Sequence, residues 1–125
     1  MRWLKYWLPT LLWMLIIFLF SSRPALHAST VNWLDFGLKK TAHYVEYYIL
    51  FILMAYSFIH TFSFSRKLIL LIVLIITILY ATSDEYHQSL VPGREPRIRD
   101  VLIDSWGAMV ALATIALIRP SDTTG

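Results

Sequence analysis

Four stretches without a formally charged side chain constrain the fold of this 125-residue chain more than any other feature. They cover residues 6–22, 47–65, 68–83 and 105–118, and segments that contain charged residues separate them. Within each stretch the apolar residues form a block rather than an alternating or one-faced pattern. Blocks of this kind are typical of transmembrane helices, so the pattern predicts an all-α integral membrane protein.

We predict a four-helix transmembrane bundle that forms one membrane domain over residues 1–125, with spans at about 5–22, 40–62, 67–88 and 100–118. The composition agrees, because 58% of the residues are hydrophobic and 15% are charged, whereas soluble domains are about 45–50% apolar. The absence of cysteine excludes disulfides and thiolate chemistry. The basic residues flank the apolar blocks and form no tract, so we expect no nucleic acid partner.

The lengths of the uncharged stretches draw ionisable residues into the membrane. Residues 68–83 make only about 24 Å of helix, whereas the hydrocarbon core is about 30 Å thick. The third span must therefore extend to Gln88, the fourth must extend back past Asp104, and the second must start near Lys40. Because the second and fourth spans run opposite to the third, these polar extensions share one end of the bundle; they contain His43, Glu46, Asp84, Glu85, His87 and Asp104.

The first block and the charged loops bear on topology. Arg2 and Lys5 precede the first block as in a signal peptide, but its aromatic-rich core and the three later blocks favour a retained span. Arg66 and Lys67 lie in a very short loop with few acidic neighbours, which favours cytoplasmic N- and C-termini and an outward-facing charged end. The apolar spacing of residues 31–38 fits a short interfacial helix before the second span.

Helical spacing places the polar residues of each span on a shared face. The predicted faces are Lys40, His43 and Tyr47 on the second span, Asp84, His87 and Gln88 on the third, and Asp100, Asp104, Gly107 and Ala111 on the fourth. Gly107 and Ala111 form a small-xxx-small pair, which lets another helix approach closely. Three helices can therefore direct polar faces at one point near the membrane surface.

Three explanations of these polar faces remain open at the level of sequence. Charges at span ends often lie among lipid headgroups without any function. A structural ion-pair network would instead join basic residues to acidic ones, with Lys40, Arg94, Arg97 or Arg99 against Glu85, Asp100 or Asp104. The third explanation is a ligand-handling or catalytic site, because ionisable groups inside a membrane are functional candidates.

Each residue type suggests a role in such a site. Histidine and carboxylates include zinc ligands, but the spacing matches no His-Glu-x-x-His pattern, so we assign no metal ligand and identify no cofactor. Basic side chains would hold a phosphate. The candidates are Glu85, His43 and Asp104 for catalysis, Lys40, Arg94, Gln88 and Tyr47 for ligand or phosphate binding, and Glu46, Asp84, His87 and Asp100 for ion pairs or support of the other groups.

Two segments resemble the motifs of the VanZ-like membrane proteins. "KTAHYVEY", from Lys40 to Tyr47, resembles the K-x-x-H-x-x-x-Y signature of that family. "SDEYHQSLVPGREPRIRDVLIDSWGA" resembles its D-E-x-H-Q…P-G-R…D-x-x-x-D-x-x-G segment, and "IFLFSSRP" is similar to the usual end of its first span. The resemblance covers nearly the whole chain and implies that the candidate residues named above are the functional positions.

The family takes its name from a low-level resistance factor against the glycopeptide antibiotic teicoplanin, which implies work on the cell envelope. The resemblance therefore implies a multi-pass protein of the bacterial cytoplasmic membrane. We hypothesise that a polar pocket in the outer leaflet binds or modifies an anionic lipid or lipid-linked envelope precursor, with an effect on teicoplanin susceptibility.

The alternative is a structural or partner subunit whose charged cluster is an ion-pair lock, without catalysis. The sequence therefore leaves open whether the chain is an enzyme. The expected partners are membrane lipids or a lipid-linked precursor, with a homo-oligomer or another membrane protein as further candidates.

Overall fold

The computed structural model describes residues 2–21, 32–90 and 98–118. Four helices follow in chain order: α1 (Arg2–Ser21), α2 (Asn32–Thr61), α3 (Arg66–Gln88) and α4 (Ile98–Leu117). No strand occurs within the three described ranges. Each helix contains a segment that is long and apolar enough to cross a membrane. The predicted all-α transmembrane bundle is therefore confirmed, and the chain is a multi-pass membrane protein.

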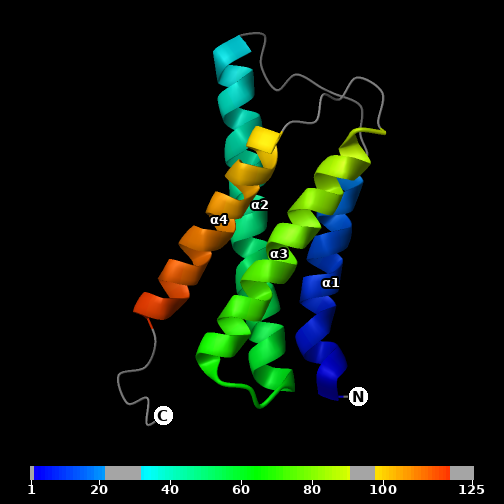
Figure 1. Cartoon of the computed structure of the whole chain (residues 1–125). Helices are drawn as coiled ribbons and strands as arrows, with labels where there is room; N and C mark the ends of the chain where they lie inside the picture. Colours follow the sequence, from blue (N-terminus) through cyan, green and yellow to red (C-terminus); the bar gives the residue numbers. More distant parts are fainter. Residues whose placement is uncertain (1, 22–31, 91–97, 119–125) are drawn as a thin grey trace.

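The central helix of the bundle is α2, which packs against α1, α3 and α4, while α3 also packs against α4. Successive helices run in opposite directions (Figure 1). The start of α2, the end of α3 and the start of α4 consequently lie at the upper end of the bundle in Figure 1, opposite the N-terminus. We refer to this upper end as the polar end, because the ionisable residues of the three helices gather there.

The helix α2 begins at Asn32, well before the predicted start of the second span near Lys40. The predicted interfacial helix is not separate: from Asn32 its residues continue directly into α2. The segment contains no proline, and its one glycine, Gly37, costs a helix only about 1 kcal/mol relative to alanine. Nothing in the local sequence therefore stops the helix before Lys40. The other predicted bounds differ from the observed ones by three residues or fewer.

Residues 62–65 make the short turn between α2 and α3. Ser65 caps α3, because its Oγ accepts a hydrogen bond of 3.2 Å from the Leu68 backbone N–H, which has no partner inside the helix. Arg66 donates a hydrogen bond of 2.7 Å to the backbone carbonyl of Ile115, near the C-terminus of α4. These contacts join three helices at the end of the bundle opposite the polar end.

Large apolar side chains along α1 point away from the bundle. Leu8, Leu11, Leu12, Leu15 and Leu19 are each about half exposed. In water this much exposed apolar surface would be unfavourable. In hydrocarbon the same side chains are well solvated, so their exposure agrees with a helix that faces lipid.

Side-chain hydrogen bonds join the helices in the apolar region. Thr10 of α1 and Ser57 of α2 share a buried hydrogen bond of 2.7 Å between their hydroxyls. The Tyr80 hydroxyl of α3 donates to the Met14 carbonyl of α1 at 2.7 Å. Such bonds contribute to helix association in membranes, where burial of apolar surface does not drive it.

The helices α4 and α2 approach each other closely at Gly107. An added Cβ at this position would overlap with the backbone carbonyl oxygen of Tyr44. Ala108 and Ala111 on the same side of α4 are fully buried. The small residues of the fourth span therefore permit the close contact that the sequence predicted.

Replacing Gly107 by alanine is expected to destabilise the bundle. The new methyl group would meet a backbone atom rather than a flexible side chain, so α2 and α4 would have to separate. Overpacking of this kind costs about 1–3 kcal/mol. The measurement is the thermal unfolding midpoint of the purified protein in detergent, which should fall clearly for Gly107→Ala.

The matched control is Gly37→Ala on α2, where an added Cβ meets nothing within 4 Å. Alanine should there be neutral or slightly stabilising, because it favours the helix more than glycine does. Equal midpoints for the two variants would contradict the close α2–α4 contact.

Candidate functional site

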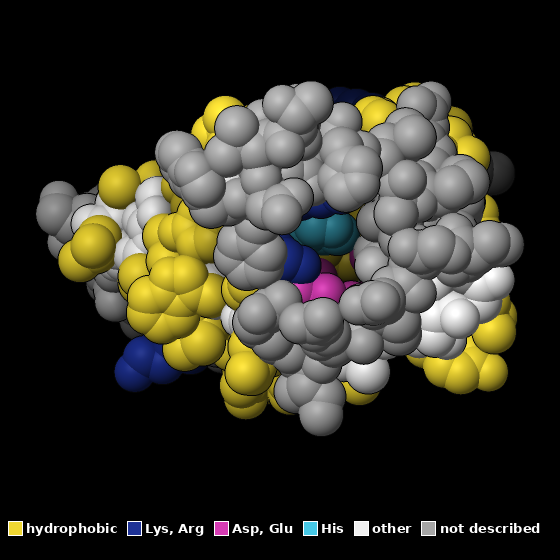
Figure 2. Space-filling model, turned by 90° about the horizontal axis from the view of Figure 1, so that it is seen from above, with side chains coloured by type: hydrophobic (Ala, Val, Ile, Leu, Met, Phe, Trp, Pro, Cys, Tyr) yellow, Lys and Arg dark blue, Asp and Glu magenta, His cyan; other side chains and the backbone are white. Residues whose placement is uncertain are grey.

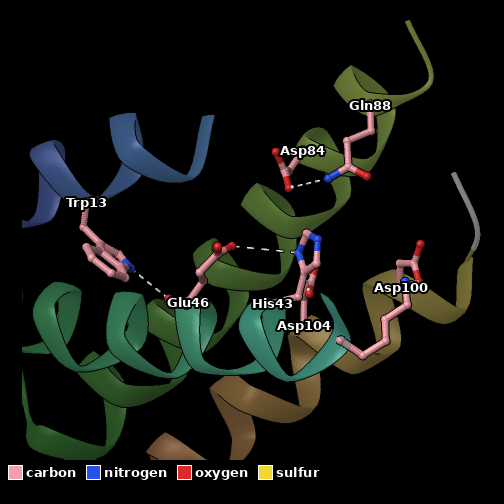
Figure 3. A network of polar contacts seen from close by, with 8 residues as sticks. Trp13, His43, Glu46, Asp84, Gln88, Asp100 and Asp104 are labelled. Atoms are coloured by element: carbon pink, nitrogen blue, oxygen red, sulfur yellow. Dashed lines mark hydrogen bonds and ion pairs between the residues drawn. The ribbon is translucent and has the colours of Figure 1, made fainter. Parts of the chain in front are cut away.

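Six side chains from three helices converge at the polar end of the bundle. They are His43 and Glu46 of α2, Asp84, Glu85 and Gln88 of α3, and Asp104 of α4, and we call them the polar cluster. In Figure 3 the labelled members of the cluster extend from the three helices toward a common region. Seen from this end, basic, acidic and histidine side chains lie close together near the centre of the molecule (Figure 2).

The members on α3 belong to the buried stripe of that helix. Val73, Thr77 and Ala81 are fully buried and follow one another at intervals of four residues. Asp84 and Glu85 continue this stripe by one turn, and their exposed fractions are only 5% and 8%. Because successive turns of one helix face stay in register, the same stripe that fills the apolar core directs two carboxylates inward at the polar end.

Gln88 closes the same face of α3 one turn beyond Asp84. Its Nε2 lies 3.4 Å from Asp84 Oδ2, at the long end of the hydrogen-bond range (Figure 3). Gln88 is itself 5% exposed. The amide therefore helps to fix the orientation of the Asp84 carboxylate rather than facing solvent.

His43 lies between acidic side chains of two helices. Its Nδ1 is 3.5 Å from Oδ1 of Asp104 on α4 and 3.9 Å from Oε1 of Glu46 on its own helix. Asp104 is only 1% exposed, whereas the side chains of His43 and Glu46 are 19% and 18% exposed. The imidazole thus faces a buried carboxylate on one side and a partly solvated one on the other, an arrangement suited to proton transfer or to metal binding.

An ion pair joins α2 and α4 beside the polar cluster. Lys40 Nζ contacts and hydrogen-bonds Asp100 Oδ1, and both side chains are largely buried. Lys40 was expected to hold a phosphate and Asp100 to make ion pairs. The contact between them is one of those that the ion-pair explanation of the charges had suggested.

Three further predicted site residues, Tyr47, His87 and Arg94, are not among the six side chains of the polar cluster. Tyr47 is fully buried on α2, beside Asp84 and Asp104. The ring of His87 stacks on Phe18 of α1, with 4.6 Å between the ring centroids. Arg94 lies outside the described residues, so its predicted phosphate-binding role stays a prediction.

The sequence did not indicate that Trp13 of α1 contacts the residues around the polar cluster. Its indole Nε1 donates a hydrogen bond of 2.9 Å to the backbone carbonyl of Glu46, and Figure 3 shows this contact beside the polar cluster. This hydrogen bond joins α1 to α2, the helix that carries His43. A tryptophan in the middle of an apolar span, away from the membrane surface, was the signal that could have indicated it.

A comparison of the chain with protein-family models matches VanZ/LLP1 over residues 6–119. The match covers α2, α3 and α4 completely and nearly all of α1. No curated protein and no solved structure matched the chain. The family match agrees with the motifs that contain Lys40, His43, Asp84, Glu85 and Asp104. The chain belongs to the VanZ/LLP1 family.

Proposed function

We propose that the polar end binds, or binds and modifies, the anionic headgroup of a membrane lipid or lipid-linked envelope precursor. One observation carries this proposal: Asp84, Glu85 and Asp104 are buried together in a bundle whose outer surface is largely apolar. Ionisable groups at membrane depth are costly to bury and usually serve a function. A lipid is the ligand that reaches such a position without leaving the membrane.

In this proposal the chains and the headgroup of the lipid contact different parts of the protein. Acyl or isoprenoid chains would lie along exposed apolar side chains such as Leu15 and Leu19 of α1, which are about half exposed. The headgroup would then lie at the polar end. Lys40 has three N–H donors, so its ammonium group can contact Asp100 and a phosphate oxygen at the same time. Arg94 follows in the chain as a second candidate for the phosphate.

The cellular setting of the proposal is the outer leaflet of a bacterial cytoplasmic membrane. The short loop at the opposite end of the bundle contains Arg66 and Lys67, which favours its retention in the cytoplasm. Both termini would then be cytoplasmic, and the polar end would face outward as a pocket for envelope lipids. In this position, headgroup binding or modification would alter teicoplanin susceptibility if the lipid carries a cell-wall precursor.

The Lys40–Asp100 contact favours a second candidate function, an ion-pair lock in a structural or partner subunit. In that case the polar end needs only to hold α2 against α4, and no ligand is bound. Burying an ion pair specifies geometry more reliably than it stabilises a fold, so the contact alone does not exclude a site beside it.

Lipid binding by the purified full-length protein tests the first candidate. We expect at least tenfold preference for a phosphate-headed lipid, undecaprenyl phosphate or phosphatidylglycerol, over a neutral diacylglycerol. Lys40→Ala should remove most of the preference, because a charge-assisted contact with the phosphate is lost. Native mass spectrometry of the delipidated protein with defined lipid mixtures gives the measurement.

The control for this experiment is Lys67→Ala, which removes the same charge at the opposite end of the bundle. Lys67 is exposed, so its loss should leave the preference unchanged. Equal binding of neutral and anionic lipids by the unaltered protein, or equal effects of the two lysine variants, would overturn the proposal.

A double-mutant cycle tests the ion-pair lock. Lys40→Met alone leaves the Asp100 carboxylate without its lysine and should cost about 1–3 kcal/mol of stability. The double variant Lys40→Met with Asp100→Asn should recover part of this loss, because no uncompensated charge remains. Thermal unfolding midpoints of the four proteins measure the coupling. Additive single effects would show that the pair does not stabilise the bundle.

A further inference from the structure

His43, Asp84 and Asp104 bring three metal-ligand atoms together from three different helices. One nitrogen or oxygen atom of each side chain lies within 4.8 Å of the corresponding atoms of the other two. Asp84 and Asp104 are 5% and 1% exposed. Because each ligand comes from a separate helix, no local spacing in the sequence indicates this group.

We propose that His43, Asp84 and Asp104 bind a divalent metal ion, with zinc as the ion that fits best. Zinc accepts histidine nitrogen and carboxylate oxygen at about 2.0–2.2 Å. Catalytic zinc sites use three protein ligands and keep a further position for water or substrate. One imidazole and two carboxylates form a ligand set of that size, whereas sites for magnesium or calcium rely on oxygen ligands alone.

A buried oxygen supports a missing ligand at this position. Oδ1 of Asp104 lies 3.5 Å from His43 Nδ1 but makes no well-formed hydrogen bond within the described residues. The hydroxyl of Tyr47, a side chain that is 0% exposed, faces the Asp84 carboxylate and so adds a further polar group to the same place. Buried polar atoms are normally satisfied, so the exception at Asp104 indicates a bound group.

The geometry requires only small movements of the side chains. Ligand atoms about 2.1 Å from a tetrahedral zinc ion lie about 3.4 Å apart. The present separations of up to 4.8 Å would therefore close by about an ångström or more. A rotation of the His43 ring, whose side chain is 19% exposed, can shorten its distances to the two carboxylates. Rotations of the Asp84 and Asp104 side chains would shorten the distance between the carboxylates.

Neighbouring groups provide the support that metal ligands usually have. Gln88 lies 3.4 Å from the Oδ2 atom of Asp84 and holds this carboxylate in place. The Glu46 carboxylate is 3.9 Å from His43 Nδ1, so it can help to orient the imidazole as a ligand. A divalent ion would also offset the repulsion between the buried carboxylates of Asp84 and Asp104.

The metal site would supply positive charge for an anionic headgroup in a cluster rich in carboxylates. This role rests on the proposed lipid-binding function, whereas the metal site itself does not. The two proposals are therefore tested separately: metal binding is measured in detergent without added lipid, and lipid binding is measured by headgroup preference.

The metal experiment starts from the purified full-length protein after treatment with a chelator. Zinc is added, unbound ion is removed, and bound zinc is measured by inductively coupled plasma mass spectrometry. We expect about one zinc ion per chain, and a loss of at least tenfold in zinc affinity for His43→Gln and for Asp104→Asn. X-ray absorption at the zinc edge should show nitrogen and oxygen ligands with one imidazole.

His60→Gln is the matched control, because His60 is an exposed histidine on α2 near the opposite end of the bundle. The His60→Gln variant should bind zinc as the unaltered protein does. This result would distinguish zinc bound at the proposed site from zinc bound by surface histidines. Size-exclusion profiles show whether each variant is folded, and Asp84→Asn replaces any variant that is not.

The proposal would be overturned if neither zinc nor manganese bound stoichiometrically, or if the unaltered protein and the folded cluster variants bound the metal equally. An absorption spectrum without imidazole scattering would have the same consequence, and this measurement needs no variant. Binding of manganese in place of zinc, with the same dependence on His43 and Asp104, would support the site.

Discussion

The close contact between α2 and α4 determines where the polar cluster forms. The backbone of α4 at Gly107 lies directly against the Tyr44 carbonyl of α2, and no side chain larger than hydrogen fits between them. His43 precedes Tyr44 in the chain, and Asp104 is one turn before Gly107. The same contact that packs the helices therefore brings His43 Nδ1 to 3.5 Å from Asp104, at a depth where the Asp104 carboxylate is 1% exposed.

The bundle has one kind of polar interaction in its apolar region and another at its polar end. Hydroxyl pairs such as Thr10 with Ser57 join helices in the apolar region and are satisfied by each other. At the polar end, by contrast, acidic groups from α3 and α4 face one histidine, while the Lys40–Asp100 pair lies beside them. A stable bundle does not require buried carboxylates at this density. The concentration of such groups at a single end is the reason for proposing a site for an anionic headgroup, with a metal ion as its source of positive charge.

Much of this architecture could be predicted from the sequence. Hydropathy located the spans, and their alternating directions placed Lys40, Asp84 and Asp104 at the same end, because helix length and membrane thickness leave little freedom. Other details depend on helix rotation and on side-chain conformation, which periodicity does not specify. The stacking of His87 on Phe18 and the convergence of three metal-ligand atoms are of this kind. The contact of Lys40 with Asp100 was one of several ion pairs that the sequence allowed, and periodicity did not select it from the others. The early start of α2 was missed because the charged residues near Lys40 suggested a boundary that the backbone does not have.

The most direct test of a functional polar end compares abundance with activity for Glu85→Gln. Glu85 is 8% exposed on the inward face of α3, and glutamine preserves its shape while removing its charge. The measurement pairs quantitative immunoblotting of membranes with the preference of each purified protein for an anionic over a neutral lipid. The account predicts normal abundance together with loss of the preference for the anionic lipid. Loss of abundance in parallel with that preference would contradict it and favour a purely structural role for the charged end.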